Sequence, residues 1–493
     1  MRTDSCRGEG DAVSLAMARL PSSRDAARAM NPPRLLDPAI ATTPDKGAAR
    51  CPGRSTRDII IADGDAPPAA LLAEAPAFLG DADIDFDRYT SPAFFAREME
   101  RLWPRVWQWA CREEHLPEVG DTLVYDIGRH SILLVRTADH GIKAYHNACL
   151  HRGTQFRPPG SIGSATELRC PFHGWSWTLD GDLKNIPCRW DFPHVTDDAF
   201  RLPEVRVETW GGFVFVNMDA DAAPLTSFLG ILPEHFGGSW NPATRVIALH
   251  IQKDLPTNWK AAQEAFLEAY HVLETHAQAL ITASDANAQY DIFGEHVSRF
   301  VHTIGVQSPH LAEAVTQQVI FDAMRLGEDR PKLADGQTAR SAAAAILREN
   351  LGTAWNVDLS GTSTSEMIDS IEYHLFPNMC LFPGVSLPLV YRFRPDGLNP
   401  SRTIFDLLLL RPLADGEAVP FPPDPVRLTV EQSYAEAPGM NPGLGHVFDQ
   451  DTDNLAAQYR GFQASRKQGQ TLGNYQESRI RHFHQTLDRY LDD

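Results

Sequence analysis

The sequence predicts an α+β protein in which a small all-β module precedes a larger domain with an antiparallel sheet flanked by helices. In the first module, hydrophobic residues alternate from Leu123 to Ile127 and run without interruption from Ile132 to Val135. These patterns are typical of half-buried and fully buried strands, respectively. In the larger domain, runs with a strand period and runs with a helix period do not alternate strictly, which favours an antiparallel over a parallel sheet. The two observations indicate two domains of different architecture.

The first part of the chain, residues 1–84, differs in composition from the rest. It is rich in Ala, Arg, Pro and Asp, and its hydrophobic residues follow no sustained period. Because such a segment offers little apolar surface to bury, we expect a disordered N-terminal tail. A transit peptide is the alternative, but acidic residues such as Glu9 and Asp11 are unusual in those peptides.

Residues 85–225 are expected to form a helix followed by the all-β module. Ser91 and Pro92 are typical first residues of a helix. The apolar residues that follow, from Phe94 to Trp103, recur at near-helical spacing. A further buried-strand run closes the module at Phe213–Val216.

Residues 226–493 are expected to form the larger domain. Its clearest element is a C-terminal helix in which Ile480, Phe483, Leu487 and Leu491 share one face, as in a helix that covers a core. The predicted strands are Val246–Ile251, Ile371–Phe376, Leu389–Phe393 and Thr403–Leu410, and the predicted helices are Trp259–Glu274, Ala342–Leu347 and Gln476–Leu491.

Charge and cysteine content exclude several classes of protein. The 493 residues include 64 acidic and 45 basic side chains, and the net charge of −19 argues against nucleic acid or an anionic membrane as a partner. The longest apolar runs are strand-length, far from the roughly 20 residues that a membrane-spanning helix needs. Seven cysteines are too few for a disulfide framework in a chain of this length. We therefore expect a cytoplasmic protein whose important cysteines are ligands or nucleophiles.

Two short segments each offer one cysteine and one histidine. Cys149 and His151 form C-x-H, and Cys170 and His173 form C-x2-H. Thiolate and imidazole bind zinc and iron–sulfur clusters. One Cys–His pair in each segment suits a Rieske [2Fe–2S] centre, where two cysteines hold one iron and two histidines hold the other. A Cys2His2 zinc site is the alternative, although zinc fingers usually keep like ligands together.

Around these residues the sequence closely resembles the Rieske-type aromatic-ring-hydroxylating oxygenases, large (alpha) subunit. The resemblance is carried by His146–Gly153, Cys170–Trp177 and Asp180–Leu183, and it extends from about Tyr89 to the C-terminus. It implies that residues 85–225 contain a Rieske domain. It also implies that residues 226–493 form a catalytic domain of the helix-grip type that holds mononuclear non-heme Fe(II).

A second candidate metal site lies near the start of the larger domain. Glu264, Glu268 and His271 are spaced by four and three, so a helix would place them on one face. His271 and His276 are five residues apart, so both reach one metal only if the helix ends or distorts between them. Taken alone, two such histidines are more often ordinary residues of an amphipathic helix. The segment from Asn258 to His276 matches the family pattern N-W-K…E…D/E-x-Y-H-x4-H, and the resemblance implies that both histidines bind iron.

A carboxylate would complete the facial triad of a non-heme iron oxygenase. The candidates are Asp449, Asp451 and Asp453, which on their own are typical of a solvated loop or a helix cap. The family places its ligand two residues before an acid–Asn pair, here Asp453-Asn454. The resemblance therefore implies Asp451 as the third iron ligand.

The resemblance also implies catalytic roles for Asn258 and Glu268. Glu268 lies three residues before His271 and can accept a hydrogen bond from the ring nitrogen that does not bind metal. In the family, the carboxylate at this position connects the iron histidine to a Rieske histidine of the neighbouring subunit in a trimer, which here would be His173.

The implied function is that of a terminal oxygenase component acting in aromatic hydrocarbon catabolism. It would insert oxygen from O2 into an apolar, aromatic substrate by ring cis-dihydroxylation, with electrons from NAD(P)H through a separate reductase or ferredoxin. A homotrimer is expected, with or without β subunits. Monooxygenation or oxidative demethylation is the alternative within the family, and an electron-transfer protein or a zinc-binding module is the alternative outside it. We expect substrate contacts from Leu280–Phe300 and Val385–Phe405.

Overall fold

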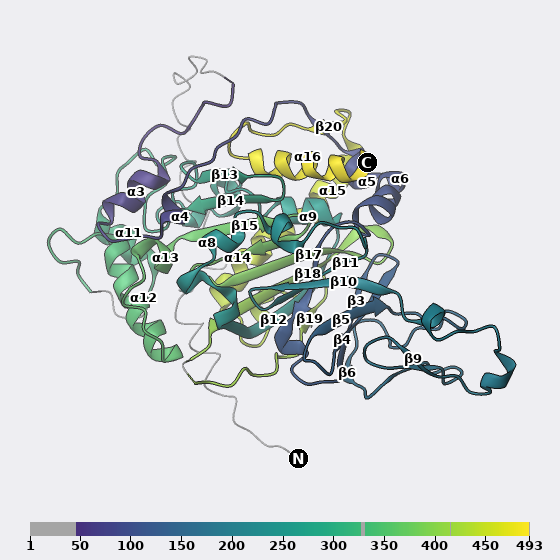
Figure 1. Cartoon of the computed structure of the whole chain (residues 1–493). Helices are drawn as coiled ribbons and strands as arrows, with labels where there is room; N and C mark the ends of the chain where they lie inside the picture. Colours follow the sequence, from purple (N-terminus) through teal and green to yellow (C-terminus); the bar gives the residue numbers. More distant parts are fainter. Residues whose placement is uncertain (1–45, 327–330, 415, 493) are drawn as a thin grey trace.

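The computed structural model describes residues 46–326, 331–414 and 416–492 (Figure 1). The first domain forms the elongated part at the lower right of Figure 1, and the second domain forms the larger body. Strands of both domains contribute to one continuous hydrophobic core. The predicted division near residue 226 lies in the segment between the last strand of the first domain and the first strand of the second. No helix in the described ranges is long and apolar enough to cross a lipid bilayer.

The first domain is all-β, as predicted. In the described part of the chain its main sheet has seven antiparallel strands in the order β2-β11-β10-β5-β4-β3-β6. A smaller sheet, β7-β8-β9, flanks the second Cys–His segment. The strands are β2 (Gln108–Arg112), β3 (Asp121–Ile127), β4 (His130–Arg136), β5 (Ile142–His146), β6 (Ile162–Ser164), β7 (Leu168–Arg169), β8 (Ser176–Trp177), β9 (Leu183–Asn185), β10 (Glu204–Trp210) and β11 (Phe213–Asn217).

Both faces of the main sheet are buried, which explains the uninterrupted apolar run in β4. Ile132 and Leu134 belong to the core that is shared with the second domain. Leu133 and Val135 belong to a separate core that also contains Trp175 and the two cysteines of the Cys–His segments. Because successive side chains of a strand point to opposite faces, β4 connects these segments to the body of the protein.

The second domain is built on a sheet whose described strands follow the order β13-β14-β15-β16-β17-β18-β12-β19. Neighbouring strands are antiparallel except β12 and β19, which are parallel. The predicted antiparallel sheet is therefore correct except at one edge. The strands are β12 (Arg245–Leu255), β13 (Gln289–Phe293), β14 (Val297–His302), β15 (Ser370–Leu375), β16 (Met379–Leu381), β17 (Leu389–Asp396), β18 (Asn399–Pro412) and β19 (Val426–Leu428).

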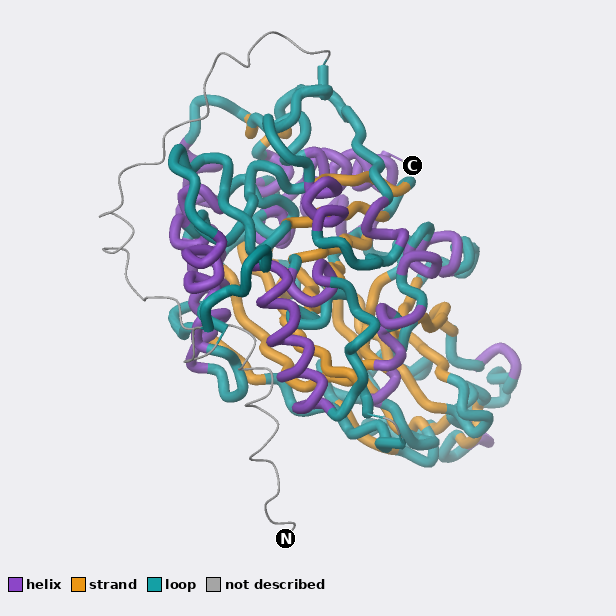
Figure 2. Tube along the Cα trace, turned by 90° about the vertical axis from the view of Figure 1, so that its left-hand side faces the viewer, coloured by secondary structure: helices purple, strands orange, loops and turns teal. Residues whose placement is uncertain are grey.

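Helices pack around this sheet. The C-terminal helix α16 (Ser478–Asp492) contacts β13 and β14, and its predicted apolar face is buried in the main core. Figure 2 shows the helices at the α11–α12 end of the molecule lying in front of the strands. The other helices are α5 (Asp87–Thr90), α6 (Pro92–Arg97), α7 (Leu225–Leu229), α8 (Leu232–His235), α9 (Trp259–Glu264), α10 (Val272–Thr275), α11 (Gln317–Met324), α12 (Ala339–Trp355), α13 (Thr364–Ile368), α14 (Pro442–Asp453) and α15 (Leu455–Ala464).

The helix predicted over Trp259–Glu274 is two short helices instead. α9 ends at Glu264, and α10 is a single turn from Val272 to Thr275. The backbone between them is not helical. The expectation that Glu264, Glu268 and His271 share one helix face is therefore wrong, and these side chains have different surroundings.

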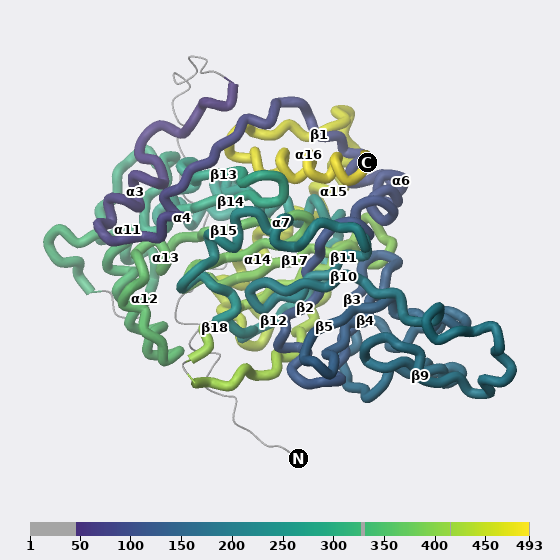
Figure 3. The backbone as a smooth tube through the Cα atoms, viewed as in Figure 1, coloured from purple at the N-terminus to yellow at the C-terminus, as the bar shows by residue number. Residues whose placement is uncertain are grey.

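The prediction of a disordered tail is wrong for residues 46–84, while residues 1–45 lie outside the described residues. Residues 46–85, called the N-terminal strap below, contain α3 (Thr56–Ala62), α4 (Ala69–Leu72) and β1 (Ile84–Asp85). β1 pairs with β20 (Gly469–Gln470). Figure 3 shows the strap running along the top of the molecule from the α11 side towards α6. Its residues Ile59, Ile60 and Leu71 are buried.

Buried polar contacts hold the strap on the second domain. The guanidinium of Arg340 in α12 pairs with Asp63 of the strap at 2.6 Å and with Asp369 at 2.7 Å. Arg299 of β14 donates to the carbonyl oxygens of Ala70 and Ala73. Asp63 and Arg340 are 277 residues apart in the sequence, so the composition of the strap does not reveal this partner.

We expect Arg340→Ala to lower the free energy of unfolding by about 3–5 kcal/mol, because it leaves the buried carboxylates of Asp63 and Asp369 without their cation. Denaturant unfolding measures this loss. Arg402→Ala is the matched control: Arg402 pairs with Asp254, and the two side chains are 44% and 43% exposed, so its loss should cost at most about 1 kcal/mol. Equal losses in the two variants would contradict a buried anchor.

Candidate metal centres

The two Cys–His segments fold into matching loops. Cys149 lies after β5 and Cys170 directly after β7. In each loop the carbonyl oxygen of the cysteine accepts the N–H of a glycine four residues later, Gly153 or Gly174, and the cysteine N–H donates to the carbonyl oxygen five residues later. Both glycines have positive φ, +76° and +72°, a conformation that other residues rarely adopt. The sequence therefore builds the same tight turn twice.

The four donor side chains of these loops lie close together. Both cysteines are 3% exposed, and burial raises the pKa of Cys149 to about 11, with Cys170 contributing as a neighbouring thiol. The His151 and His173 rings are 4.7 Å apart between centroids. The backbone N–H of His151 donates to Cys149 Sγ at 3.5 Å. Two buried sulfurs and two adjacent imidazoles are the donor set of a Rieske cluster.

The ligand pattern of these loops favours a two-iron cluster over a zinc finger. Each loop pairs one cysteine with one histidine, whereas zinc fingers usually keep like ligands together. His151 Nδ1 is buried and has no hydrogen-bond partner among the described residues, so it is free for a metal.

A second centre forms where α10 meets α14. His271 precedes the single turn of α10 and His276 follows it, so the helix ends between them as the spacing required. Asp451 is in the last turn of α14. Its Oδ1 lies 2.6 Å from His276 Nε2 and 3.3 Å from His271 Nε2. Two imidazoles and one carboxylate are the donor set of a non-heme iron centre.

Each of these imidazoles is oriented through its other nitrogen. His271 Nδ1 bonds Glu268 Oε1 at 2.7 Å, and His276 Nδ1 bonds Gln450 Oε1 at 3.0 Å. Because the Glu268 and Gln450 oxygens accept, both Nδ1 atoms donate, and both Nε2 atoms point toward the Asp451 carboxylate, where a bound metal ion would take the place of a proton. Such contacts fix the tautomer and direction of metal-binding histidines.

The charges at this centre favour a bound cation. Burial raises the pKa of Asp451, but the neighbouring His276 and His271 outweigh it and lower that pKa to about 2. Burial lowers the pKa of His271, but the carboxylates of Glu268 and Asp451 raise it to about 10. The Glu268 and Asp451 side chains are only 9% and 8% exposed. Two buried carboxylates around two imidazoles need positive charge between them.

The other acidic residues nearby do not reach the two histidines. Asp449 accepts the N–H of Tyr434 at 3.0 Å and the hydroxyl of Ser433. Asp453 is exposed to solvent at the end of α14. Glu264 is buried away from the metal centre and is bonded by the Tyr89 hydroxyl at 2.8 Å and by His484 Nε2 at 2.8 Å. Of the three candidate aspartates, the structure brings Asp451 to the two histidines.

Of the two predicted catalytic residues, the structure brings Glu268 to the metal centre. Asn258 caps the start of α9 instead: its Oδ1 accepts the N–H of Lys260 at 3.1 Å and its Nδ2 donates to Pro400 at 2.7 Å. Gln450 was not predicted from the sequence, although it stands next to Asp451. Its position beside the proposed ligand was the one available signal.

A cavity of about 220 Å³ opens onto the second centre and is called the substrate cavity below. The predicted stretches contribute Ala283, Phe300, Leu387, Leu389 and Tyr391. The other walls come from segments that were not predicted, chiefly the α9–α10 region, β15 and α14. Those residues are Ala265, Phe266, Glu268, Ala269, His271, Val272, His276, Gln278, Ala279, His302, Ile304, Ser370, Glu372, Phe382, Leu444, Val447, Phe448 and Asp451.

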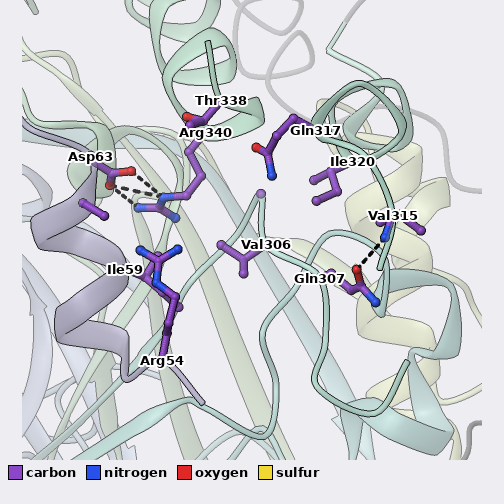
Figure 4. A pocket seen from close by; sticks show the side chains of 12 residues that line it. Arg54, Ile59, Asp63, Val306, Gln307, Val315, Gln317, Ile320, Thr338 and Arg340 are labelled. Atoms are coloured by element: carbon purple, nitrogen blue, oxygen red, sulfur yellow. Dashed lines mark hydrogen bonds and ion pairs between the residues drawn. The ribbon is translucent and has the colours of Figure 1, made fainter. Parts of the chain in front are cut away.

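A second cavity, of about 200 Å³, lies between the strap and α11–α12 (Figure 4). Its polar groups are already engaged. Arg340 pairs with Asp63, Gln307 accepts the N–H of Val315, and Gln317 accepts that of Ala339. None of the metal-binding residues described above lines it. The substrate cavity is therefore the candidate active site.

Comparisons with protein families agree with this donor chemistry. A family model for the Rieske [2Fe-2S] domain matches residues 106–196, and a model for the ring hydroxylating alpha subunit (catalytic domain) matches residues 243–493. The chain belongs to the ring-hydroxylating oxygenase alpha subunits. It therefore has two cofactor sites: a [2Fe–2S] site in the Rieske domain and a His/His/Asp mononuclear iron site in the catalytic domain. The predicted family and cofactors are confirmed.

Individual relatives of this alpha subunit match over shorter stretches. The large oxygenase component of salicylate 5-hydroxylase from a Ralstonia species is 32% identical over 208 residues, which are 39% of this chain and 48% of that protein. Biphenyl 2,3-dioxygenase subunit alpha from Rhodococcus jostii is 33% identical over 190 residues, 37% of this chain and 41% of that protein. The matches thus span half or less of the length of these curated relatives.

Solved structures share the fold over most of the chain. A quaternary ammonium Rieske monooxygenase has a TM-score of 0.59 at 16% identity and covers 84% of this chain and 96% of its own. Naphthalene 1,2-dioxygenase has a TM-score of 0.57 at 18% identity and covers 85% and 94%. The predicted two-domain fold is confirmed.

Asp451→Ala should remove the mononuclear iron and leave the Rieske cluster intact, because two imidazoles alone bind the metal weakly and leave its charge unbalanced. Iron and sulfide analysis, together with the visible and electron paramagnetic resonance spectra of the cluster, measures both sites in one sample. Asp453→Ala, two residues further along α14, is the control and should keep both metals. Retention of mononuclear iron by Asp451→Ala would contradict the assignment.

Proposed function

We propose that this alpha subunit is the terminal component of an oxygenase that adds oxygen from O2 to an apolar, aromatic substrate by ring cis-dihydroxylation. The observation that carries the proposal is the convergence of His271, His276 and Asp451 at one wall of an otherwise largely apolar cavity, in a chain that also contains a Rieske domain. When bound, the cluster supplies single electrons, and the iron(II) supplies a site for O2.

The residues of the site would have distinct roles. His271, His276 and Asp451 hold the metal at the cavity wall, and Glu268 and Gln450 orient the two imidazoles. The apolar wall binds a ring compound by burying its surface and excludes water from the reacting region. Aromatic side chains such as Phe266, Phe300 and Phe448 suit a planar substrate.

The connection between the two metal sites would run between subunits. His173 is exposed on the first domain, which extends away from the body of the protein that contains α9 and α14 (Figure 1). Glu268 already binds His271 through Nδ1 and through its backbone N–H, but a carboxylate has further lone pairs. We propose that it accepts a hydrogen bond from His173 of the partner subunit in a homotrimer.

Exposed aromatic side chains support this assembly. Phe172 and Trp190 of the first domain are 58% and 80% exposed, and Tyr270, between Glu268 and His271, is 54% exposed. We propose that these three side chains lie in the contact between subunits. The electron donor would be a separate reductase or ferredoxin, and the protein would act in the cytoplasm.

Monooxygenation or oxidative demethylation is the second candidate. Proteins named as a hydroxylase and as a monooxygenase are among those similar to this chain. The retention of all three iron ligands speaks against a protein that only transfers electrons.

Reconstitution with a reductase, NAD(P)H and 18O2 tests the reaction. A dihydrodiol that carries two labelled atoms for each NAD(P)H oxidised is the expected product, because dihydroxylation uses both atoms of O2, two electrons and two protons. A product with one labelled oxygen atom would contradict dihydroxylation and support monooxygenation. Loss of a methyl group as formaldehyde would support oxidative demethylation. Failure to label any compound of an aromatic panel would contradict oxygenase activity.

Glu268→Gln should keep both metals and the oligomeric state yet slow turnover by more than about tenfold, because a neutral amide orients His271 without the carboxylate charge. The measurement is single-turnover oxidation of the reduced cluster with substrate and O2, beside metal analysis and light scattering. Glu274→Gln changes an exposed glutamate of α10 in the same way and should behave as wild type. Wild-type rates in Glu268→Gln would rule out the bridge.

A further inference from the structure

We propose that the substrate cavity is selective for uncharged ring compounds, and that His302 and Ser370 form its binding site for one neutral hydroxyl, ether or carbonyl substituent. The inference rests on the proposed oxygenase function and narrows its substrate class. It excludes aromatic carboxylates and organic cations as good substrates. The first exclusion follows because no lysine or arginine lines the cavity in the described ranges, and the second because the acidic residues of the wall are already paired.

The wall offers no cation to a carboxylate. Neither lysine nor arginine is among the residues that line the cavity in the described ranges. The buried cation behind the wall, Arg479, is fully committed: it donates to Glu372 at 2.7 Å, to Leu267 at 3.0 Å and to Ser298 at 3.1 Å. A carboxylate that enters an apolar cavity loses its water and finds no counter-charge, which is costly.

The wall also offers no unpaired anion to a cationic substrate. Its three acidic residues each have a partner: Glu268 binds His271, Asp451 lies between His276 and His271, and Glu372 pairs with Arg479. A substrate cation would have to displace one of these partners. The remaining wall is aliphatic and aromatic, and its neutral polar groups are those of Gln278, Ser370, His302 and the Tyr391 hydroxyl.

His302 and Ser370 stand opposite each other on adjacent strands. They are paired residues of β14 and β15, and both line the cavity. His302 is 9% exposed, and its Nε2 has no hydrogen-bond partner among the described residues. Buried polar nitrogens in proteins nearly always have a partner, so a group on the ligand, or water in its absence, is expected here.

Burial keeps the imidazole of His302 uncharged. Burial lowers the pKa of its imidazole to about 4, against the smaller opposing effects of Asp285 and Asp369 and with small contributions from His271 and His276. A neutral imidazole both donates and accepts one hydrogen bond, and the Ser370 hydroxyl does the same. Together they match a hydroxyl, ether or carbonyl oxygen better than they match an ion.

Equilibrium dialysis of the protein with both metal centres, without O2 or electron donor, tests the selectivity independently of turnover. 2-Naphthamide and 2-naphthoate have the same shape and differ in charge. We expect the carboxylate to bind about 100-fold more weakly, since it loses its hydration without a partner. Neopentylbenzene and benzyltrimethylammonium form the equivalent neutral and cationic pair. Equal affinities within either pair would overturn the proposal, as would failure of both neutral ligands to bind.

Three variants test the polar residues. His302→Phe should lower the preference for 2-naphthol over naphthalene by about fivefold, the worth of one hydrogen bond, and His302→Gln should restore part of it. Ser370→Lys adds a cation and should strengthen 2-naphthoate binding. Mononuclear iron content reports whether each variant is folded, and His302→Phe with intact iron and an unchanged preference would overturn the role of His302.

The two proposals fail in different ways. If the protein binds the neutral ligands selectively but oxygenates none of them, the oxygenase function fails and the selectivity stands. If it oxygenates 2-naphthoate as efficiently as 2-naphthamide, the function stands and the selectivity fails.

Discussion

The iron site depends on one constraint. The backbone that carries His271 and His276 must leave helical geometry after α9 and again after the single turn of α10. Between α9 and α10 the backbone leaves helical geometry, and its polar groups need partners from elsewhere. The C-terminal helix and the sheet supply them, since Arg479 of α16 donates to the carbonyl oxygen of Leu267 and the hydroxyl of Tyr290 in β13 accepts the N–H of Ala269. Both partners are fully buried. They flank Glu268, so the same contacts that satisfy the break also fix the carboxylate that orients His271.

Buried ion pairs also fix the position of the helices around the iron site. Lys260 pairs with Glu98 at 2.6 Å, and Arg479 pairs with Glu372 at 2.7 Å, with every one of these side chains at most 1% exposed. A buried pair contributes little net stability compared with apolar packing, but breaking it is costly. Such pairs therefore help to select one position of α9 against the helical segment at Glu98, and one position of α16 against β15. The strap is fastened by the same means, through Arg340 and Arg299, and it lies beside the strands that carry Tyr290.

The sequence allowed good predictions where a residue's role depends on its near neighbours. The four candidate cluster ligands and the strands β3 and β4 follow from spacing and alternation. His271, His276 and Asp451 needed the family pattern, because two histidines five residues apart are common on amphipathic helices and three aspartates within five residues look alike until α14 is docked. Gln450, His302 and Ser370 have no local signal, since their roles arise from strands and helices that meet across the fold. The ordered strap was missed for the same reason: its polar residues find their partners in α12 and β14, hundreds of residues away.

The charges of the iron site and of the cavity are connected. Asp451 and Glu268 together carry two negative charges at the metal, and a divalent iron balances both. The second imidazole is held by the neutral Gln450 instead of a second carboxylate, so no further negative charge remains at the centre. Glu372, the third acid of the wall, is balanced by Arg479. With iron bound, the whole wall is therefore close to neutral, although the chain as a whole has a net charge of −19. A charged substrate would find no opposite charge at this wall to offset its loss of hydration, whereas a neutral ring compound has no charge to desolvate. Apolar contact and hydrogen bonds to the His302–Ser370 pair therefore determine binding.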